Sequence, residues 1–276
     1  ILTGGAGSDV MDGGDGDDAL SESGDADFTL SDDQLVTNDG SGDVTDSIAG
    51  FEGAGLEGGD GDNVIDAGNF SGATSLVGGA GDDALTGGDN IDIIDGGAGN
   101  DSIDGGGGDD TLSGGDGADV IDGADGADQI DGGDGNDVID GGPGDDNLSG
   151  GDGSDQMTGG DGSDLMDGGL GDDELTESGD TDFTLTDDQL VSNDGSGDVT
   201  DQISGFEGAD LTGGAGDNLI DAGGFTGDTT LSGGDGADEL TGGSGSDQID
   251  GGAGNDELLG GGGDDHPATL EGPAAG

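Results

Sequence analysis

The sequence contains no lysine and no arginine, although 69 of its 276 residues are aspartate or glutamate. Its formal net charge is −69 at pH 7, so the carboxylates have no lysine or arginine to pair with inside the chain. Nucleic acids and anionic membrane surfaces are poor partners, because binding them depends on those two residues. The counter-charge must come from solution, and cations are therefore the expected ligands.

Cysteine is also absent, and the one histidine is His266. Disulfides and thiolate metal sites are excluded, and a single imidazole cannot build a transition-metal site alone, so only hard oxygen ligands remain. No apolar run is long enough to cross a bilayer, and we expect no membrane insertion. Because the chain starts at Ile1, in front of a repeat and without a signal segment, we expect a piece or processed form of a longer protein.

Tryptophan and tyrosine are missing, and hydrophobic residues make up 26% of the chain, a composition that ordinarily indicates intrinsic disorder. The 75 glycines could instead suggest collagen. Collagen needs glycine at every third position and abundant proline, however, and this chain has three prolines. A regular period of nine residues argues against both classes.

Gly78 to Thr176 divides into eleven consecutive nonapeptides with the pattern G-G-x-G-x-D-x-U-x, in which U is a large aliphatic residue. Further copies start at Gly4, Gly13, Gly58, Gly213, Gly233, Gly242, Gly251 and, in degenerate form, Gly260. Self-similarity at a fixed period is the mark of a repeat architecture.

A longer repeat lies over the short one, because residues 1–121 match 156–276 at a shift of 155. We therefore divide the chain into a first superrepeat, 1–155, and an incomplete second one, 156–276, with a degenerate tail at 266–276. The regular turns of the first superrepeat lie at 4–21, 58–66 and from 78 onward. Each superrepeat carries an irregular insert, 22–57 and 177–212, long enough for two coils of eighteen residues. We expect wider coils with a phenylalanine-containing core and without the regular metal-binding turn; a separate small β-domain is the alternative.

Within each nonapeptide the glycine-rich first six residues suit a turn, and the last three suit a short strand. The U residues should point inward from two facing parallel sheets: Met11, Leu20, Leu85, Ile94, Ile103, Leu112, Ile121, Ile130, Ile139, Leu148, Met157, Met166 and Leu175. Where the fourth glycine is replaced, at Asn90, we expect the left-handed conformation that asparagine tolerates.

Stacking brings turns two repeats apart to about 4.8 Å from one another, so their carboxylates form a column. Two unit charges about 5 Å apart repel by roughly 3 kcal/mol at an effective dielectric near 20. A Ca²⁺ ion reverses the sign, because it accepts six to eight oxygen ligands in flexible geometry, whereas Mg²⁺ demands tighter octahedral geometry. Folding and calcium binding should therefore be one event.

These repeats resemble the RTX, or hemolysin-type, calcium-binding nonapeptides. The resemblance implies an all-β fold, a right-handed parallel β-solenoid (β-roll) with many Ca²⁺ ions. It also implies that each sixth-position aspartate binds calcium together with backbone carbonyls of its own turn and with the turn two repeats along. The implied ligands are Asp9, Asp18, Asp83, Asp92, Asp101, Asp110, Asp119, Asp128, Asp137, Asp146, Asp155, Asp164, Asp173, Asp238, Asp247, Asp256 and Asp265.

Several positions depart from the family pattern. Asn63 and Asn218 replace the sixth-position aspartate, and Ala124 replaces a second-position glycine. His266-Pro267 falls where the last repeat should have its strand, which leaves calcium binding least certain at Asp265.

Other functions are less well supported by the residues. Paired carboxylates occur throughout and none is distinguished, so we expect no enzyme. The run 38–43 and its copy 193–198 resemble part of an EF-hand loop but lack flanking helices and a closing glutamate, so we prefer a solvated turn. Ninth positions carry Asp, Ser or Thr in nearly every repeat, which leaves open a face for ice or mineral beside the simpler interpretation of a solvated surface.

The function that we expect is structural: a secreted, extracellular or cell-surface protein, forming a segment of a surface fibre, adhesin or matrix protein. Its partners should be calcium ions, with self-association into filaments or sheets. The alternative is the calcium-folded export module of a secreted toxin or hydrolase whose catalytic domain lies outside this chain. The superrepeat favours the fibre, because an export module has no need of long-period duplication.

Overall fold

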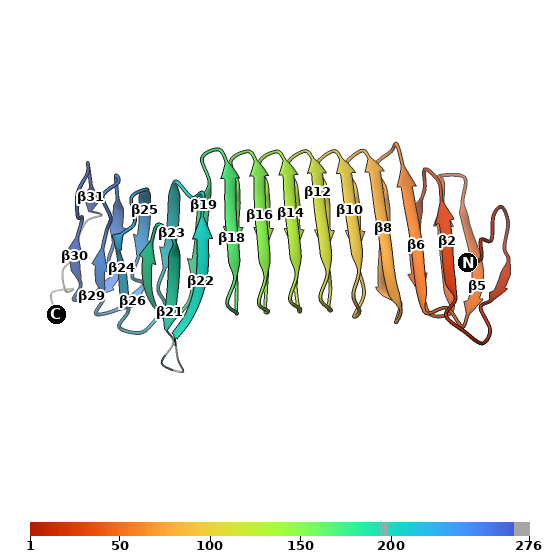
Figure 1. Ribbon diagram of the computed structural model, residues 1–276, viewed down its shortest axis with the longest axis horizontal. Helices are drawn as coiled ribbons and strands as arrows, with labels where there is room; N and C mark the ends of the chain where they lie inside the picture. Colours follow the sequence, from red (N-terminus) through yellow and green to blue (C-terminus); the bar gives the residue numbers. More distant parts are fainter. Residues whose placement is uncertain (194, 196–197, 268–276) are drawn as a thin grey trace.

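The protein is a long, two-sided β-solenoid, described by a computed structural model for residues 1–193, 195 and 198–267. Successive strands alternate between two facing sheets through the regular repeats, and the first and last strands of the described chain, β1 and β31, lie at opposite ends of the rod (Figure 1). The described residues contain strands and turns but no helix. The expected all-β parallel solenoid is confirmed.

The 15-stranded sheet contains, in spatial order, β1 (Val10–Asp12), β5 (Asp43–Ala49), β4 (Gln34–Asn38), β3 (Asp27–Ser31), β7 (Val64–Asn69), β9 (Ala84–Thr86), β11 (Ser102–Asp104), β13 (Val120–Asp122), β15 (Val138–Asp140), β17 (Gln156–Thr158), β19 (Glu174–Ser178), β23 (Gly208–Thr212), β25 (Asp228–Ser232), β28 (Gln248–Asp250) and β31 (His266–Pro267). The 14-stranded sheet contains β2 (Ala19–Ser23), β6 (Gly53–Gly59), β8 (Ala73–Ala80), β10 (Ile93–Ala98), β12 (Thr111–Asp116), β14 (Gln129–Asp134), β16 (Asn147–Asp152), β18 (Leu165–Leu170), β22 (Asp198–Ser204), β21 (Gln189–Asn193), β20 (Asp182–Thr186), β24 (Leu219–Gly224), β27 (Glu239–Thr241) and β30 (Glu257–Leu259). Two short strands, β26 (Asp235–Gly236) and β29 (Ala253–Gly254), pair in parallel and join the turns of two successive coils.

The strand register repeats every eighteen residues in the regular run. Ile103 lies opposite Ile121, and Ile121 lies opposite Ile139, in the 15-stranded sheet. Leu112 lies opposite Ile130 in the other sheet. Every predicted U residue is inside, with at most 6% of its surface exposed. The alternation of one inward aliphatic residue between two outward residues therefore builds the core, as the nine-residue pattern predicts.

Both inserts remain in the solenoid, but not as two coils of eighteen residues. In the first copy, β3, β4 and β5 form an antiparallel meander inside one sheet, joined in parallel to β7 and β1. Phe28, Leu30, Leu35 and Ile48 from this meander are buried in the common core. The expected wider coil with a phenylalanine-containing core is therefore confirmed, whereas its division into two coils of eighteen residues and the alternative of a separate β-domain are wrong.

Two polar turns cause the chain to reverse within the first insert. The Ser31 hydroxyl donates to Asp33 Oδ1 at 3.0 Å, between β3 and β4. Between β4 and β5, the Gly40 N–H donates to Asn38 Oδ1 at 2.9 Å, and Gly40 has φ of 81°. The run 38–43 is thus a hairpin turn without flanking helices, as we preferred over an EF-hand. Its copy at 193–198 falls partly outside the described residues.

The two inserts lie in different sheets. The meander β3–β5 belongs to the 15-stranded sheet, and the meander β20–β22 belongs to the 14-stranded sheet. From β3 to its equivalent β20, the chain stays in one sheet through β4 and β5 and then changes sheet at every following strand, which gives an odd number of changes. Equivalent sequences therefore face opposite sides of the rod.

Candidate metal centre: two columns of aspartates

The sixth-position aspartates form two columns, because each directly precedes a strand. One column precedes strands of the 15-stranded sheet and contains Asp9, Asp83, Asp101, Asp119, Asp137, Asp155, Asp173, Asp247 and Asp265. The other precedes strands of the 14-stranded sheet and contains Asp18, Asp92, Asp110, Asp128, Asp146, Asp164, Asp238 and Asp256. All are buried except Asp9, Asp18, Asp256 and Asp265, which are half-buried.

A ladder of backbone-to-carboxylate hydrogen bonds runs along each column. The N–H of Asp101 donates to Asp119 Oδ1 at 2.7 Å, and the N–H of Asp119 donates to Asp137 Oδ1 at 2.8 Å. The same contact joins Asp83 to Asp101, Asp92 to Asp110, Asp110 to Asp128, Asp128 to Asp146, Asp137 to Asp155, Asp146 to Asp164, Asp155 to Asp173 and Asp238 to Asp256. One oxygen of each of these acceptor carboxylates therefore fixes its aspartate against the coil before it.

The second carboxylate oxygen of most column residues is buried without a hydrogen-bond partner. This holds for Oδ2 of Asp9, Asp83, Asp101, Asp110, Asp119, Asp128, Asp137, Asp146, Asp155, Asp164, Asp173, Asp238 and Asp247, and for Oδ1 of Asp265. A buried carboxylate oxygen without a partner is costly, and more so in a chain without basic side chains. These oxygens are therefore the atoms of the fold that most need a cation.

Except in Asp9 and Asp265, each free oxygen points to the first glycine of its own turn. A Cβ atom built on Gly132 would lie 2.5 Å from Asp137 Oδ2 and 2.6 Å from the carbonyl oxygen of Gly150, in the next coil. Oxygens from two coils thus converge where any side chain would collide. Calcium binds oxygen ligands at about 2.3–2.6 Å and accepts backbone carbonyls, so this donor set fits calcium. Among the described residues, no three carboxylate or imidazole side chains are grouped to hold an ion by themselves, so carbonyls must complete each shell.

Burial raises the pKa of the column carboxyls, and neighbouring carboxylates add to the shift in several of them. Desolvation raises the pKa of Asp101, Asp110 and Asp137 to about 6, although the hydrogen bond that each accepts from the coil before it acts in the opposite direction. The pKa of Asp128 and of Asp164 is raised to about 7 by the same causes. Near neutral pH, these groups must take up either a proton or a metal ion to relieve the burial of their charge.

Three predicted positions differ from the regular arrangement. Asp92 Oδ2 accepts the N–H of Gly88 at 2.7 Å, so this carboxylate has no free oxygen. Asn63 and Asn218 occupy column positions without a charge; their N–H groups donate to the next aspartate at 2.7 and 2.8 Å. Each asparagine therefore keeps the donor side of the ladder contact, while the anionic ligand is lost.

The prediction that Asn90 adopts the left-handed conformation is wrong. In the described part of the chain, the one non-glycine residue with positive φ is Ala124, at 64°, where alanine replaces a second-position glycine. Asn90 instead uses its side-chain amide to donate to the Ser71 carbonyl at 2.8 Å. A positive φ is not required at the fourth position, because Gly126 and Gly144 of the regular turns also lack it.

Four acidic residues of the inserts extend the ladder, and the nonapeptide pattern did not identify them. Asp46 and Asp201 accept the N–H groups of Asp9 and Asp164 at 2.8 and 3.0 Å. Glu52 and Glu207 do the same for Asp18 and Asp173, at 2.9 and 3.1 Å. Their spacing of 37 or 34 residues hides them from an eighteen-residue search. The signal that could have found them is their recurrence at the same place in both superrepeats.

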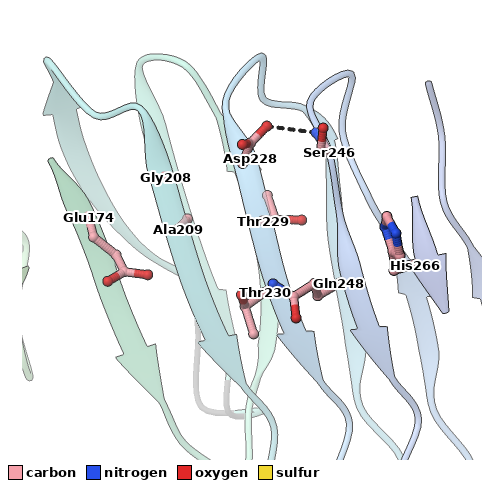
Figure 2. Close-up of a pocket in the computed structure, with 9 residues that line it drawn as sticks. All are labelled: Glu174, Gly208, Ala209, Asp228, Thr229, Thr230, Ser246, Gln248 and His266. Carbon is pink, nitrogen blue, oxygen red and sulfur yellow. Dashed lines mark hydrogen bonds between the residues drawn. The ribbon is translucent and has the colours of Figure 1, made fainter. Parts of the chain in front are cut away.

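The end of the described chain keeps a short strand at His266–Pro267, paired with β28, where we expected the pattern to fail. Figure 2 shows the surface pocket beside it, in which Glu174 and His266 lie at opposite ends of a row of strands. The hydrogen bond drawn there joins the Ser246 N–H to Asp228 Oδ1 at 2.6 Å. Among the residues drawn, no acid and base are paired.

A family model for the RTX calcium-binding nonapeptide repeat matches residues 1–28, 69–103, 77–112, 86–121, 104–139, 113–148, 140–175, 223–258 and 232–267, which together span well over half of the chain. The chain belongs to this family. Its RTX repeats form a structural calcium-binding module rather than a catalytic one, as expected. Curated proteins compared individually with the chain give no match. The described residues contain no helix that could span a membrane.

Proposed function

We propose that this chain is an extracellular structural rod: a segment of a surface fibre, adhesin or matrix protein that folds when it binds calcium. The observation that carries the proposal is the pair of columns of buried, unpartnered aspartate oxygens in a chain without lysine or arginine. Without cations these columns oppose stacking, and with cations they join each coil to the next.

The proposed ligands are the sixth-position aspartates that have a free oxygen, together with the carbonyl of the first glycine in the following coil. Asp92 is excluded by its contact with Gly88, and Asn63 and Asn218 by their lack of charge. The ligands belong to turns that lie two repeats apart, so each ion acts as a bridge between coils.

An extracellular location follows from the supply of calcium, because cytoplasmic calcium is too scarce to fill many such sites. The structural role is supported by the continuity of the rod: both inserts lie within the sheets and contribute to the same core. Repetition of a long unit along one axis suits a spacer or fibre segment.

The decisive experiment is a calcium titration of the full chain followed by far-ultraviolet circular dichroism. We expect a cooperative gain of β signal that excess chelator abolishes and that magnesium reproduces only weakly. A β-rich spectrum that persists in chelator at low salt would contradict calcium-dependent folding. Electron microscopy of the calcium-loaded protein tests the rod, and antibody labelling of intact host cells tests the location. Retention of the protein in the cytoplasm would exclude the extracellular role.

A further inference from the structure

Each insert starts with a glutamate at a position where the regular repeat has its first glycine. The nonapeptide 168–176 is followed by Glu177, and the nonapeptide 13–21 is followed by Glu22. Glu177 lies opposite the fully buried Leu211 in the strand register, and Glu22 lies opposite the buried Leu56. Both glutamates therefore point into the solenoid, at the junction between the regular turns and the insert.

The two glutamates make the same contact, although they belong to different sheets. Glu177 Oε1 accepts the N–H groups of Gly159 and Gly160 at 2.9 and 3.4 Å. Glu22 Oε1 accepts the N–H of Gly4. In each copy the acceptor thus lies over the first glycine of the turn eighteen residues earlier.

A carboxylate of the aspartate ladder lies at the same place. A Cβ atom built on Gly159 would lie 2.6 Å from Asp164 Oδ2, which is 2% exposed as a residue and has no hydrogen-bond partner. A Cβ atom on Gly4 would lie 2.7 Å from Asp46 Oδ2 and 3.4 Å from Glu22 Oε1.

In the regular turns a neutral carbonyl occupies this place. From Gly96 to Gly150, the corresponding point lies 2.5–2.8 Å from the carbonyl oxygen of the first glycine in the next coil. At the junctions no such glycine exists, and a glutamate carboxylate takes the place of the carbonyl. Two negative groups therefore meet where a regular turn has one, and the chain supplies no lysine or arginine to separate them.

We propose that each junction holds a divalent cation in a site of a different composition, in which a glutamate replaces the glycine carbonyl of the regular turns. Glu177 and Asp164 bind it in the second copy, Glu22 and Asp46 bind it in the first, and backbone carbonyls complete the shell. Calcium is the ion of choice, because it combines carboxylate and carbonyl ligands in flexible geometry. The site rests on the calcium-binding function proposed above, but it uses insert residues that the nonapeptide pattern does not contain. Its ion would tie the meander to the last regular turn.

The test is the number of calcium ions bound by the full chain, measured by equilibrium dialysis with calcium alone. Glu177→Gln keeps an acceptor for Gly159 and Gly160 but removes the charge. The matched control is Glu174→Gln, on the same strand but exposed on the outer face. We expect one ion fewer in Glu177→Gln, one fewer in Glu22→Gln, two fewer in the double variant and no loss in the control.

Several outcomes would overturn the proposal. An unchanged ion count in both single variants, with unchanged affinity, means that the glutamate shares a proton with its neighbour instead of a metal ion. If circular dichroism shows that both variants stay unfolded at every calcium concentration, the glutamates are structural and not ligands. A wild-type chain that binds no calcium defeats the proposed function itself, whereas normal wild-type binding with unaffected variants defeats the junction site alone.

Discussion

Substitutions of Asp119, in the middle of a column, distinguish the contribution of the metal ion to stability from that of the hydrogen bond. Asp119 Oδ1 accepts the N–H of Asp101 at 2.7 Å, whereas Asp119 Oδ2 has no partner. Asp119→Asn preserves the acceptor and removes the negative charge. Asp119→Ala removes both, so the buried N–H of Asp101 also loses its partner.

The expected losses differ in size. When free calcium is about 100-fold above the dissociation constant, each ion lost lowers the free energy of unfolding by about 2.7 kcal/mol, which is the expected effect of Asp119→Asn. An unsatisfied buried N–H costs a further 1–3 kcal/mol or so, which brings Asp119→Ala to about 4–6 kcal/mol.

Denaturant unfolding at a series of free calcium concentrations measures these changes, because the slope against the logarithm of calcium reports the ions released. The control is Asp122→Asn, at an exposed ninth position where Oδ1 accepts the Ala124 N–H at 3.0 Å. The assigned register is refuted if Asp119→Asn keeps the wild-type slope, or if Asp122→Asn loses as many ions as Asp119→Asn.

Three further predictions address the pH dependence, the turns and the core. Burial raises the pKa of Asp128 from 3.8 to about 7. In the calcium-free chain this group therefore stabilises the fold below about pH 4, and that contribution is lost as the pH rises through 7. Circular dichroism in chelator should show the β signal falling over this range, and saturating calcium should remove the pH dependence. Ala124→Gly should raise the free energy of unfolding by about 1 kcal/mol, because glycine adopts the φ of 64° without the strain that alanine bears there. Ala118→Gly, at an exposed turn position, should give no such gain. An equal effect of the two substitutions in denaturant unfolding would contradict the strain at Ala124. Ile121→Ala should cost about 2–5 kcal/mol in the calcium-loaded protein, and Val120→Ala, whose side chain is 53% exposed, less than about 1 kcal/mol; comparable losses would contradict the inward and outward assignment.

The period of nine residues predicts the strands, the inward residues and the columns, because a solenoid repeats one local geometry and each coil packs only against its neighbours. Ile121 and Asp119 could therefore be placed from their positions in the pattern alone. Prediction failed where the local geometry changes. The antiparallel path of β3–β5 depends on two turns that an alternating pattern of apolar residues does not specify, since parallel and antiparallel strands share the same alternation.

The ladder residues Asp46 and Glu52 were not predicted for a related reason. Their place in the columns depends on how much chain the meander takes up, which is a property of the folded insert and not of the repeat. Asn90 shows the reverse case. Asparagine tolerates the left-handed conformation without requiring it, and Asn90 instead donates its side-chain amide to the Ser71 carbonyl.

The placement of the inserts in opposite sheets has a mechanical consequence. Between β1 and β7, the 15-stranded sheet carries three strands where the facing sheet has only β6 between β2 and β8. When one of two packed sheets has more strands than the other over the same stretch, the solenoid axis would bend towards the sheet with fewer strands. In the second superrepeat the longer layer is on the other side of the rod. Because the chain changes sheet an odd number of times between the inserts, the two mismatches in a rod built of such units would oppose one another instead of adding along its long axis (Figure 1).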